Sequence, residues 1–430
     1  MGNAAKKVWG YRHIVLLVLW LLYIVNYFDR ISVLTFLPYI QRDLNLTPVE
    51  IGQLASVFFF AYALAQVTAG FLADKFGSKK IMGIAIIVFT AVTALTGAIR
   101  SFGQFIALRI GLGLGEGHHF APACRTINHW FPIQERGRAT SFFTTSWAIA
   151  PAIVPVLITS LSAYVFSGEW RPVFYFLAIP GIIAIWALWY FVFDSPKEAL
   201  NKGRISEEEY HLINQASTAK EEEPKKKKNY GIFLKDGYFY VYVIALFSQL
   251  MVYWGITTWL TTFLVKQHGM DIKQMGFFAS APYIVAFFAM MLGGWLMDKV
   301  FGRMKPVALI AYLGGIPVLW FLGVVEKGNN GLLLMLLLLA GFFINLNFGS
   351  IYAFVQKRYP KEIVGSATGL ANGLGQMGSF VSPLVAGYLV QTGPNGAQDF
   401  SMVFLFFALG SAVAALCSFI LKEKQIETSE

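Results

Sequence analysis

The sequence alternates long apolar stretches with short polar connections. Each stretch is close to the roughly 20 residues that a helix needs to cross a bilayer, and none shows the period-two alternation of a membrane-spanning strand. Several are longer, so we expect those helices to tilt or protrude. The twelve stretches are 14–40, 51–73, 81–99, 104–130, 139–164, 172–193, 239–266, 275–297, 305–325, 331–356, 365–390 and 400–421. This pattern predicts an all-α membrane protein with twelve transmembrane helices.

A long polar segment divides the twelve stretches into six and six. We therefore expect an N-terminal six-helix bundle over 1–193, a cytoplasmic linker over 194–238 and a C-terminal six-helix bundle over 239–430. The linker holds acidic runs and the basic run Lys225–Lys228, which is either a solvated linker or a contact for anionic membrane lipid.

The two halves share sequence motifs. GFLADKFG at 70–77 recurs as GWLMDKVFG at 294–302, and Arg138-Ala-Thr140 recurs as Ser366-Ala-Thr368. Because offsets of 224 and 228 residues span nearly a whole half, we expect two bundles related by pseudo-two-fold symmetry. Repeats of this kind place a binding site between the halves near the membrane midplane.

Composition supports a membrane location. Charged residues make up only 13% of the chain, against about 25% in soluble domains, and apolar residues 56%. The net charge of +10 does not indicate nucleic-acid binding, because 25 of the 34 Lys and Arg fall on one side if both termini are cytoplasmic, and six on the other. This is the positive-inside asymmetry. We expect a multi-pass monomer in a bacterial inner membrane; the two cysteines predict no disulfide framework.

Four charged residues remain deep inside predicted helices. They are Asp29 and Arg30 in the first helix, and Arg109 and Glu116 in the fourth. Each costs about 2.5–3.5 kcal/mol to place at a membrane centre, so we expect them to be paired or functional. Arg109 and Glu116 are two turns apart and share a helix face, with glycines between them that permit close approach of a backbone or ligand.

These residue types suit a carrier of anions and protons. A guanidinium binds carboxylate or phosphate through a planar fork, and burial favours the neutral form of a carboxyl, which can then exchange protons near neutral pH. We expect Arg30 to bind the substrate anion, Asp29 and Glu116 to carry protons, and Arg109 to pair with Asp29. The alternative is a satisfied charge cluster that only specifies helix packing.

The segment GFLADKFGSKK at 70–80 resembles the loop 2–3 signature of the major facilitator superfamily, and the resemblance extends over essentially the whole chain. It implies a latch on the cytoplasmic side that opens when the carrier faces inward. The residues expected in it are Asp74, Lys75, Arg136, Arg138 and Asp298. We expect Asp74 to accept hydrogen bonds from a helix N-terminus or to pair with Arg136 or Arg138; alternatively, the motif acts only in topology and folding. Ser78 departs from the arginine frequent in that signature.

Several motifs resemble the anion:cation symporter branch, which includes galactonate, glucarate, hexuronate, sialic-acid and vesicular glutamate carriers. They are Tyr27-Phe-Asp-Arg30, Phe60-Ala-Tyr62-Ala with Gln66, Arg109 to Glu116, and Trp130-Phe-Pro with Glu135-Arg136. The resemblance implies that Asp29 and Glu116 are proton sites, Arg109 a coupling residue, Arg30 a substrate ligand, and Tyr27 and Tyr62 pocket residues. His118-His119 is a departure. The pair adds a titratable or hydrogen-bonding group within one turn of Glu116, with His119 expected among the substrate-binding residues, or it is structural.

The second half offers only neutral polar groups at depth. Asn372 and Gln376 lie four residues apart on one helix face and suit hydroxyls or a second carboxylate, although hydrogen bonds between helices are an equal alternative.

We therefore expect a secondary transporter that couples protons to a small organic anion, foremost a sugar acid such as a hexonate, aldarate or hexuronate. The alternatives are an organophosphate exchanger and a dicarboxylate or aromatic-acid carrier. No nucleotide, metal or nucleophile motif occurs, so we expect neither an enzyme nor a cofactor.

Overall fold

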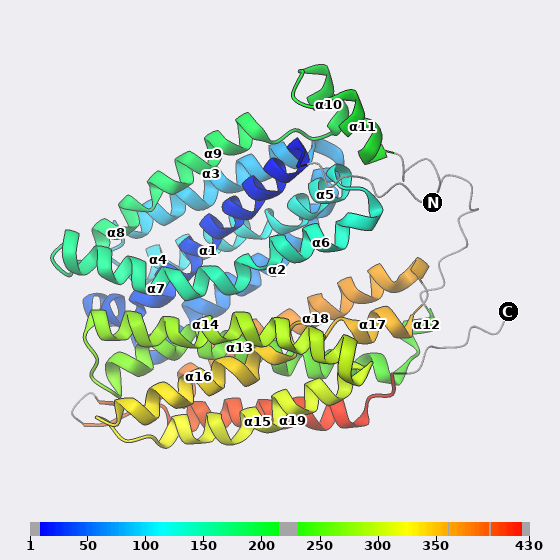
Figure 1. Cartoon of the computed structure of the whole chain (residues 1–430). Coiled ribbons are helices and arrows are strands. Elements are labelled where there is room, and N and C mark those ends of the chain that lie inside the picture. Colours follow the sequence, from blue (N-terminus) through cyan, green and yellow to red (C-terminus); the bar gives the residue numbers. More distant parts are fainter. Residues whose placement is uncertain (1–8, 215–230, 360, 395–396, 424–430) are drawn as a thin grey trace.

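The computed structural model describes residues 9–214, 231–359, 361–394 and 397–423. Figure 1 shows two groups of helices whose axes run along a common direction. The N-terminal group comprises α1 (Tyr11–Leu44), α2 (Pro48–Phe76), α3 (Ser78–Thr96), α4 (Phe102–Gly117), α5 (Phe120–Trp130), α6 (Ile133–Thr144), α7 (Ser146–Val165), α8 (Arg171–Phe176) and α9 (Ala178–Phe191).

The C-terminal group follows three short helices, α10 (Pro196–Asn201), α11 (Glu207–Asn214) and α12 (Gly231–Leu234). It comprises α13 (Gly237–Lys266), α14 (Ile272–Trp295), the π-helical turn η2 (Leu296–Phe301), α15 (Met304–Val324), α16 (Asn330–Leu346), α17 (Ala353–Arg358), α18 (Lys361–Leu389), the strands β1 (Gln391–Thr392) and β2 (Gln398–Asp399), and α19 (Ser401–Ile420). The two strands pair antiparallel.

Every stretch expected to cross the membrane overlaps one of these helices or a consecutive pair. Within the described ranges, nine helical segments are long and apolar enough to span a bilayer. The other three stretches are 104–130, 331–356 and 365–390. The first two are divided by turns, whereas the third forms the continuous helix α18, whose sequence is rich in Gly, Ser and other polar residues.

The prediction of one continuous helix over 104–130 is wrong. The helix is interrupted at His118, whose ψ of 10° departs from helical geometry, and α5 begins at Phe120. Pro122 in the first turn of α5 explains the interruption, because proline has no amide hydrogen to donate to the carbonyl of residue 118. The stretch 331–356 is likewise divided between α16 and α17.

Local sequence fixes the turns between α1, α2 and α3. The Thr47 hydroxyl accepts a hydrogen bond from the Glu50 amide (3.2 Å), and the Thr47 amide donates to the Glu50 carboxylate (2.8 Å), forming a capping box. Gly77 joins α2 to α3 with a φ of 90°, a conformation that side chains strongly disfavour. The Asp194 carboxylate accepts from the Lys79 amide (2.8 Å) and so holds this loop against the end of α9.

The two groups contact each other near one end of the molecule. We call the end where α1 begins and α19 ends the terminal end, and the other the distal end (Figure 1). In the distal part, the Ser56 hydroxyl donates to the Phe380 carbonyl (2.7 Å) and the Thr261 hydroxyl donates to the Leu34 carbonyl (2.6 Å). A Cβ on Gly52 would lie 2.5 Å from the Pro383 carbonyl oxygen, so backbones touch there directly.

Toward the terminal end the groups diverge (Figure 1). Val67 and Phe71 of α2 are 80% and 70% exposed, and Leu370 and Leu374 of α18 are each 40% exposed. The structure is therefore joined at its distal end and separated at its terminal end.

Candidate functional site

A buried ion pair joins α1 to α4. Arg30 Nη2 lies 2.6 Å from Glu116 Oε2, and Arg30 Nε lies 2.8 Å from the same oxygen. The side chains are 2% and 0% exposed. The second carboxylate oxygen, Oε1, has no hydrogen-bond partner among the described residues. Burying such a pair is costly, and removing one of its partners is more costly still.

Four aromatic rings surround the Arg30 guanidinium. Its carbon lies 4.6 Å from the centre of the Tyr62 ring, 4.9 Å from those of Tyr27 and Phe58, and 5.2 Å from that of Trp254. These distances suit cation–π attraction. Since Trp254 belongs to α13, the guanidinium lies at the interface between the two groups. Phe58 was not predicted from the sequence, although it precedes Tyr62 by four residues on the same helix face.

Arg109 has a different environment from the one expected. Its Nε donates to the Leu54 carbonyl (3.2 Å), and its guanidinium lies 4.4 Å from the centre of the Phe58 ring. Nη1 is buried without a partner in the described structure. The predicted pairing with Asp29 is wrong here, because the Arg109 side chain extends toward α2 rather than α1.

Glycines bring α4 close to α2. A Cβ on Gly113 would lie 2.5 Å from the Phe58 carbonyl oxygen, and one on Gly117 would lie 2.5 Å from the Ala65 Cβ. The prediction that this glycine pattern permits close backbone approach is confirmed, and it brings Arg109 against α2.

Asp29 points to a different side of α1 from Arg30. It is 2% exposed, and its Oδ2 has no partner within the described ranges. Glu116 and the Thr93 hydroxyl of α3 lie within electrostatic range of it. Adjacent residues on a helix point about 100° apart, which explains why Arg30 reaches the interface while Asp29 points into the N-terminal group.

The two histidines occupy contrasting sites. His118 is partly exposed, and its ring nitrogens lie 2.9 Å from the Thr68 hydroxyl and 2.8 Å from the Leu114 carbonyl. His119 is fully buried, and neither of its ring nitrogens has a partner among the residues described.

The predicted polar residues of the C-terminal group are partnered within that group. Asn372 accepts a hydrogen bond from the Tyr352 hydroxyl (3.0 Å), and Gln376 accepts one from the Ser379 hydroxyl (2.9 Å). Both are half-buried, and within the described ranges no hydrogen bond joins either to Arg30.

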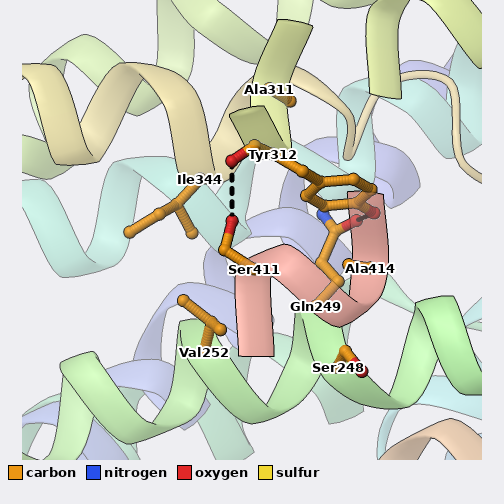
Figure 2. A pocket seen from close by; sticks show the side chains of 8 residues that line it. All are labelled: Ser248, Gln249, Val252, Ala311, Tyr312, Ile344, Ser411 and Ala414. Atoms are coloured by element: carbon orange, nitrogen blue, oxygen red, sulfur yellow. Dashed lines mark hydrogen bonds between the residues drawn. The ribbon is translucent and has the colours of Figure 1, made fainter. Parts of the chain in front are cut away.

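A second polar network, which includes residues not predicted from the sequence, lies deeper in this group. Gln249 of α13 accepts hydrogen bonds from the Tyr312 hydroxyl and from Asn347 Nδ2 (3.2 Å). Figure 2 shows Gln249 and Tyr312 side by side, with the Ser411 hydroxyl donating to the Tyr312 carbonyl (2.9 Å). The signal in the sequence was a lone glutamine within the apolar run 239–266.

The predicted latch residues lie at the terminal end, in other pairings. Asp74 accepts from Arg125 Nε (2.7 Å) rather than from Arg136 or Arg138, so that expectation is wrong for this structure. Ser78, which replaces the signature arginine, accepts from Arg125 Nη1 (3.2 Å).

The other latch residues make local contacts or are exposed. Arg136 donates to the Phe131 carbonyl (2.9 Å), and Lys75 lies 5.2 Å from the centre of the Phe76 ring. Asp298 and Arg138 are exposed. Within the described ranges, no hydrogen bond or ion pair therefore joins these groups across the terminal end.

Comparison with known proteins identifies the family. The sequence model of the Major Facilitator Superfamily matches residues 19–383 and 273–430. The chain belongs to the major facilitator superfamily. The resemblance inferred from the loop 2–3 signature is thereby confirmed, as is the twelve-helix membrane fold.

Relatives within the superfamily match the chain over nearly its full length. It is 30% identical to a probable galactarate/D-glucarate transporter of Bacillus subtilis, over 97% of this chain and 93% of the relative. It is 29% identical to a probable sulfoacetate transporter of Cupriavidus necator (95% and 93%) and 27% identical to a D-galactonate transporter of Escherichia coli (97% and 97%).

Solved superfamily structures share the fold. An inward-facing, occupied bacterial homolog of the human lysosomal transporter Spinster matches with a TM-score of 0.79 at 18% identity, over 98% of this chain and all of that one. A D-xylose–proton symporter matches with a TM-score of 0.77 at 16% identity, over 97% and 100%.

Proposed function

We propose that this protein is a secondary active transporter that moves a small organic anion, foremost a sugar acid, together with protons. The observation that carries the proposal is the Arg30–Glu116 pair, buried where the two groups meet. An arginine at that place is the group that recognises a carboxylate best, and its present partner is itself a carboxylate.

The pair suggests how binding and proton uptake are coupled. A substrate carboxylate that takes the Arg30 fork displaces Glu116. A buried carboxylate without a partner is too costly to leave ionised, so Glu116 binds a proton. When the anion leaves, Glu116 returns to Arg30 and gives the proton up. One anion and one proton thus travel together.

The remaining predicted site residues take supporting roles in this proposal. Asp29, which is buried and has no ion-pair partner among the described residues, is a second site for the same proton. Arg109 stabilises the glycine-lined contact beside Glu116. Tyr27 and Tyr62 flank the anion at Arg30. Asn372 and Gln376 of the C-terminal group would bind hydroxyls of the substrate, and they do so only after the groups approach.

We assign the terminal end to the cytoplasm, with the protein in the bacterial inner membrane as a monomer. The high density of Lys and Arg in the loops of that end supports the assignment. The structure then corresponds to an inward-facing state, in which Asp74, Lys75, Arg136, Arg138 and Asp298 are disengaged from any latch. Their re-pairing would close the cytoplasmic side. Transport of this kind requires no chemical change in the anion, so we propose no enzymatic step.

The relatives narrow the substrate class. Galactarate, glucarate and galactonate are polyhydroxylated carboxylates, which would use both the arginine and the neutral polar residues of α18. The sulfoacetate relative supports a second candidate, a small dianion without hydroxyls. The sugar acids and sulfoacetate both carry the carboxylate that Arg30 would bind. Only the sugar acids have hydroxyls that would bind Asn372 and Gln376.

Uptake into proteoliposomes tests the proposal. D-Glucarate, D-galactonate and sulfoacetate are first ranked by the thermal stabilisation they give the purified protein. We expect the best of them to accumulate under an imposed inward proton gradient with no counter-substrate inside. Arg30→Ala and Arg30→Lys should abolish uptake, whereas Arg42→Ala, at an exposed arginine of the same helix, should retain it. A requirement for internal counter-substrate would instead indicate an exchanger.

A further inference from the structure

A cavity of about 460 Å³ lies at the terminal end, between the beginning of α1 and the beginning of α6. Its lining combines two arginines and a histidine with aromatic side chains and one carboxylate. These residues are Trp9, Arg12, His13, Phe131, Glu135 and Arg138. The volume falls within the range of sites that bind small molecules. We call this space the terminal cavity.

The terminal cavity lies on the same side of α1 as Arg30. Arg12 and Arg30 are 18 residues apart on this helix, which is about five turns and about 27 Å along its axis. On the other wall, α6 leads into α7, which packs on the C-terminal group, because a Cβ on Gly276 of α14 would collide with Thr159 Oγ1 of α7. An anion that leaves Arg30 along this side of α1 therefore approaches the terminal cavity.

Arg12 is buried there without being fully paired. It is 4% exposed, and its Nε and Nη1 lie 3.4 Å from Glu135 Oε2 and 3.5 Å from Glu209 Oε1. Both distances exceed the roughly 2.7–2.9 Å of close charge-assisted hydrogen bonds, and Nε has no hydrogen-bond partner among the described residues. The Glu209 carboxylate lies closer to the amides of Tyr11 (3.0 Å) and Arg12 (3.1 Å). The guanidinium therefore retains the capacity to bind another carboxylate.

The other residues of the terminal cavity add a second cation and an aromatic wall. Arg138 is exposed, and no ion pair involves it within the described ranges. His13 Nδ1 accepts a hydrogen bond from the Gly10 amide (3.1 Å), so the proton of the neutral ring is on Nε2, which is a donor. The Trp9 ring stacks on that of His13, with 4.8 Å between their centres, and is 72% exposed. This set suits a small molecule that carries a carboxylate.

We propose that the terminal cavity is a second binding site for the transported anion, on its way to the cytoplasm. The inference rests on the proposed function and adds a site to it. Arg12 and Arg138 bind the carboxylate, while Trp9 and His13 flank the rest of the molecule. An anion held here is about 27 Å from Arg30 along α1, so Glu116 regains its arginine before the anion has left the protein.

Binding at the terminal cavity requires no proton. The charged and titratable groups that face Arg12 are His13 of α1, Glu135 and Arg138 of α6, and Glu209 of α11. Glu135 is 39% exposed, whereas Glu116 is 0% exposed, so a displaced Glu135 carboxylate remains ionised in contact with water. Glu209 keeps its bonds to the α1 amides. The affinity of this site should therefore depend little on pH, unlike that of Arg30.

Counting bound anions tests the proposal. The probe is radiolabelled D-glucarate, D-galactonate or sulfoacetate, whichever stabilises the purified protein most, in equilibrium dialysis at pH 7. We expect wild type to bind two anions and Arg30→Ala to bind one. Adding Arg138→Gln to Arg30→Ala should weaken the remaining site at least fivefold, and exposure of Arg138 makes misfolding an unlikely cause, which thermal denaturation checks. Arg303→Gln, at an exposed arginine between η2 and α15, is the matched control and should stay within twofold.

The pH dependence adds a readout that distinguishes this site from the first. Histidine side chains are mostly neutral above pH 7, so the comparison is made between pH 7 and 8. In Arg30→Ala the dissociation constant should change less than threefold over this interval. A wild-type protein that binds one anion would overturn the proposal. So would equal weakening by Arg138→Gln and Arg303→Gln, no weakening by Arg138→Gln, or a tenfold change in affinity over that pH interval.

Failure of the terminal cavity differs from failure of the proposed function. If wild type binds one anion and Arg30→Ala binds none, only the terminal cavity is refuted. If wild type and Arg30→Ala both bind one anion with equal affinity, and Arg138→Gln weakens it, Arg30 is refuted as the substrate ligand.

Discussion

Replacing Glu116 by glutamine separates substrate recognition from proton coupling. In the proposed mechanism the substrate displaces a carboxylate whose Oε2 lies 2.6 Å from Arg30 Nη2 and 2.8 Å from Arg30 Nε, and that carboxylate then binds one proton. Uptake of one proton per anion makes the dissociation constant rise about tenfold per pH unit, or about 1.4 kcal/mol. Between pH 6 and 8 the affinity should therefore fall about a hundredfold.

Glu116→Gln removes both the competitor and the proton acceptor. The amide is neutral at every pH, so the affinity should become independent of pH within about twofold, and proton-driven accumulation should disappear while exchange survives. The unliganded variant leaves Arg30 buried without a counter-charge, which costs about 3–5 kcal/mol. Substrate should therefore raise the melting temperature of this variant more than that of wild type.

Isothermal titration calorimetry in detergent at four pH values measures the slope, which is the change in the logarithm of the dissociation constant per pH unit. Glu198→Gln serves as the control, since Glu198 lies outside the ion pair, in α10, where its carboxylate accepts hydrogen bonds from Lys202 Nζ (2.9 Å) and the Asp194 amide (3.3 Å). Its slope should match wild type. A Glu116→Gln protein that keeps the tenfold-per-unit dependence, or a wild-type protein without it, would refute the reasoning.

Three further predictions concern the packing of α4 on α2, the ion pair between Asp236 and Arg358 before α13, and the expected cytoplasmic latch. Gly113→Ala should lower the free energy of unfolding by about 1–3 kcal/mol, because the new Cβ would lie 2.5 Å from the Phe58 carbonyl oxygen of α2. Gly103→Ala is the control, since no atom lies within 4 Å of the Cβ it would add to the same helix. Equal losses in the two variants would contradict the packing argument. Asp236→Asn should cost about 2 kcal/mol at pH 7 in thermal denaturation. Asp74→Ala should change stability by less than about 1 kcal/mol, since its pair with Arg125 is exposed, yet slow uptake; unimpaired uptake would count against a latch.

The Asp236 prediction has a defined pH dependence. Burial alone would raise the pKa of this carboxyl, but hydrogen bonds from Arg358, Tyr359 and the Tyr238 amide outweigh it and lower the pKa below its ordinary 3.8. A lowered pKa means that the stabilisation is complete above the unfolded-state value and is lost as pH falls through the folded-state value. The difference between wild type and Asp236→Asn should therefore hold from pH 5 to 8 and shrink below about pH 4.

The fold was largely predictable from the sequence because membrane helices are dictated by length and apolarity. The helix expected over 104–130 was wrong because a single residue changes the backbone. Pro122 interrupts an apolar run whose composition alone predicts one continuous helix. Counting charges inside the membrane found the four deep residues, since their cost is independent of tertiary structure.

The contacts that the deep charged residues make were less predictable. Spacing shows which residues share a helix face but not which neighbouring helix that face meets. Arg109 was therefore assigned to Asp29, whereas Gly113 and Gly117 bring α4 against α2 and turn the arginine to a backbone carbonyl. Asp74 was similarly expected to pair with Arg136 or Arg138, whereas Arg125 of α5 is the arginine that contacts it.

The Arg30–Glu116 ion pair also has a consequence for the transporter when no substrate is bound. With no cargo bound, Arg30 and Glu116 neutralise each other, so the vacant protein can reorient without a net charge crossing the membrane at this site. In the proposed mechanism, a proton that arrives without an anion would have to break that pair and leave the buried guanidinium without a counter-charge. The contact that we propose the substrate displaces would therefore also protect the cell against an unproductive proton leak.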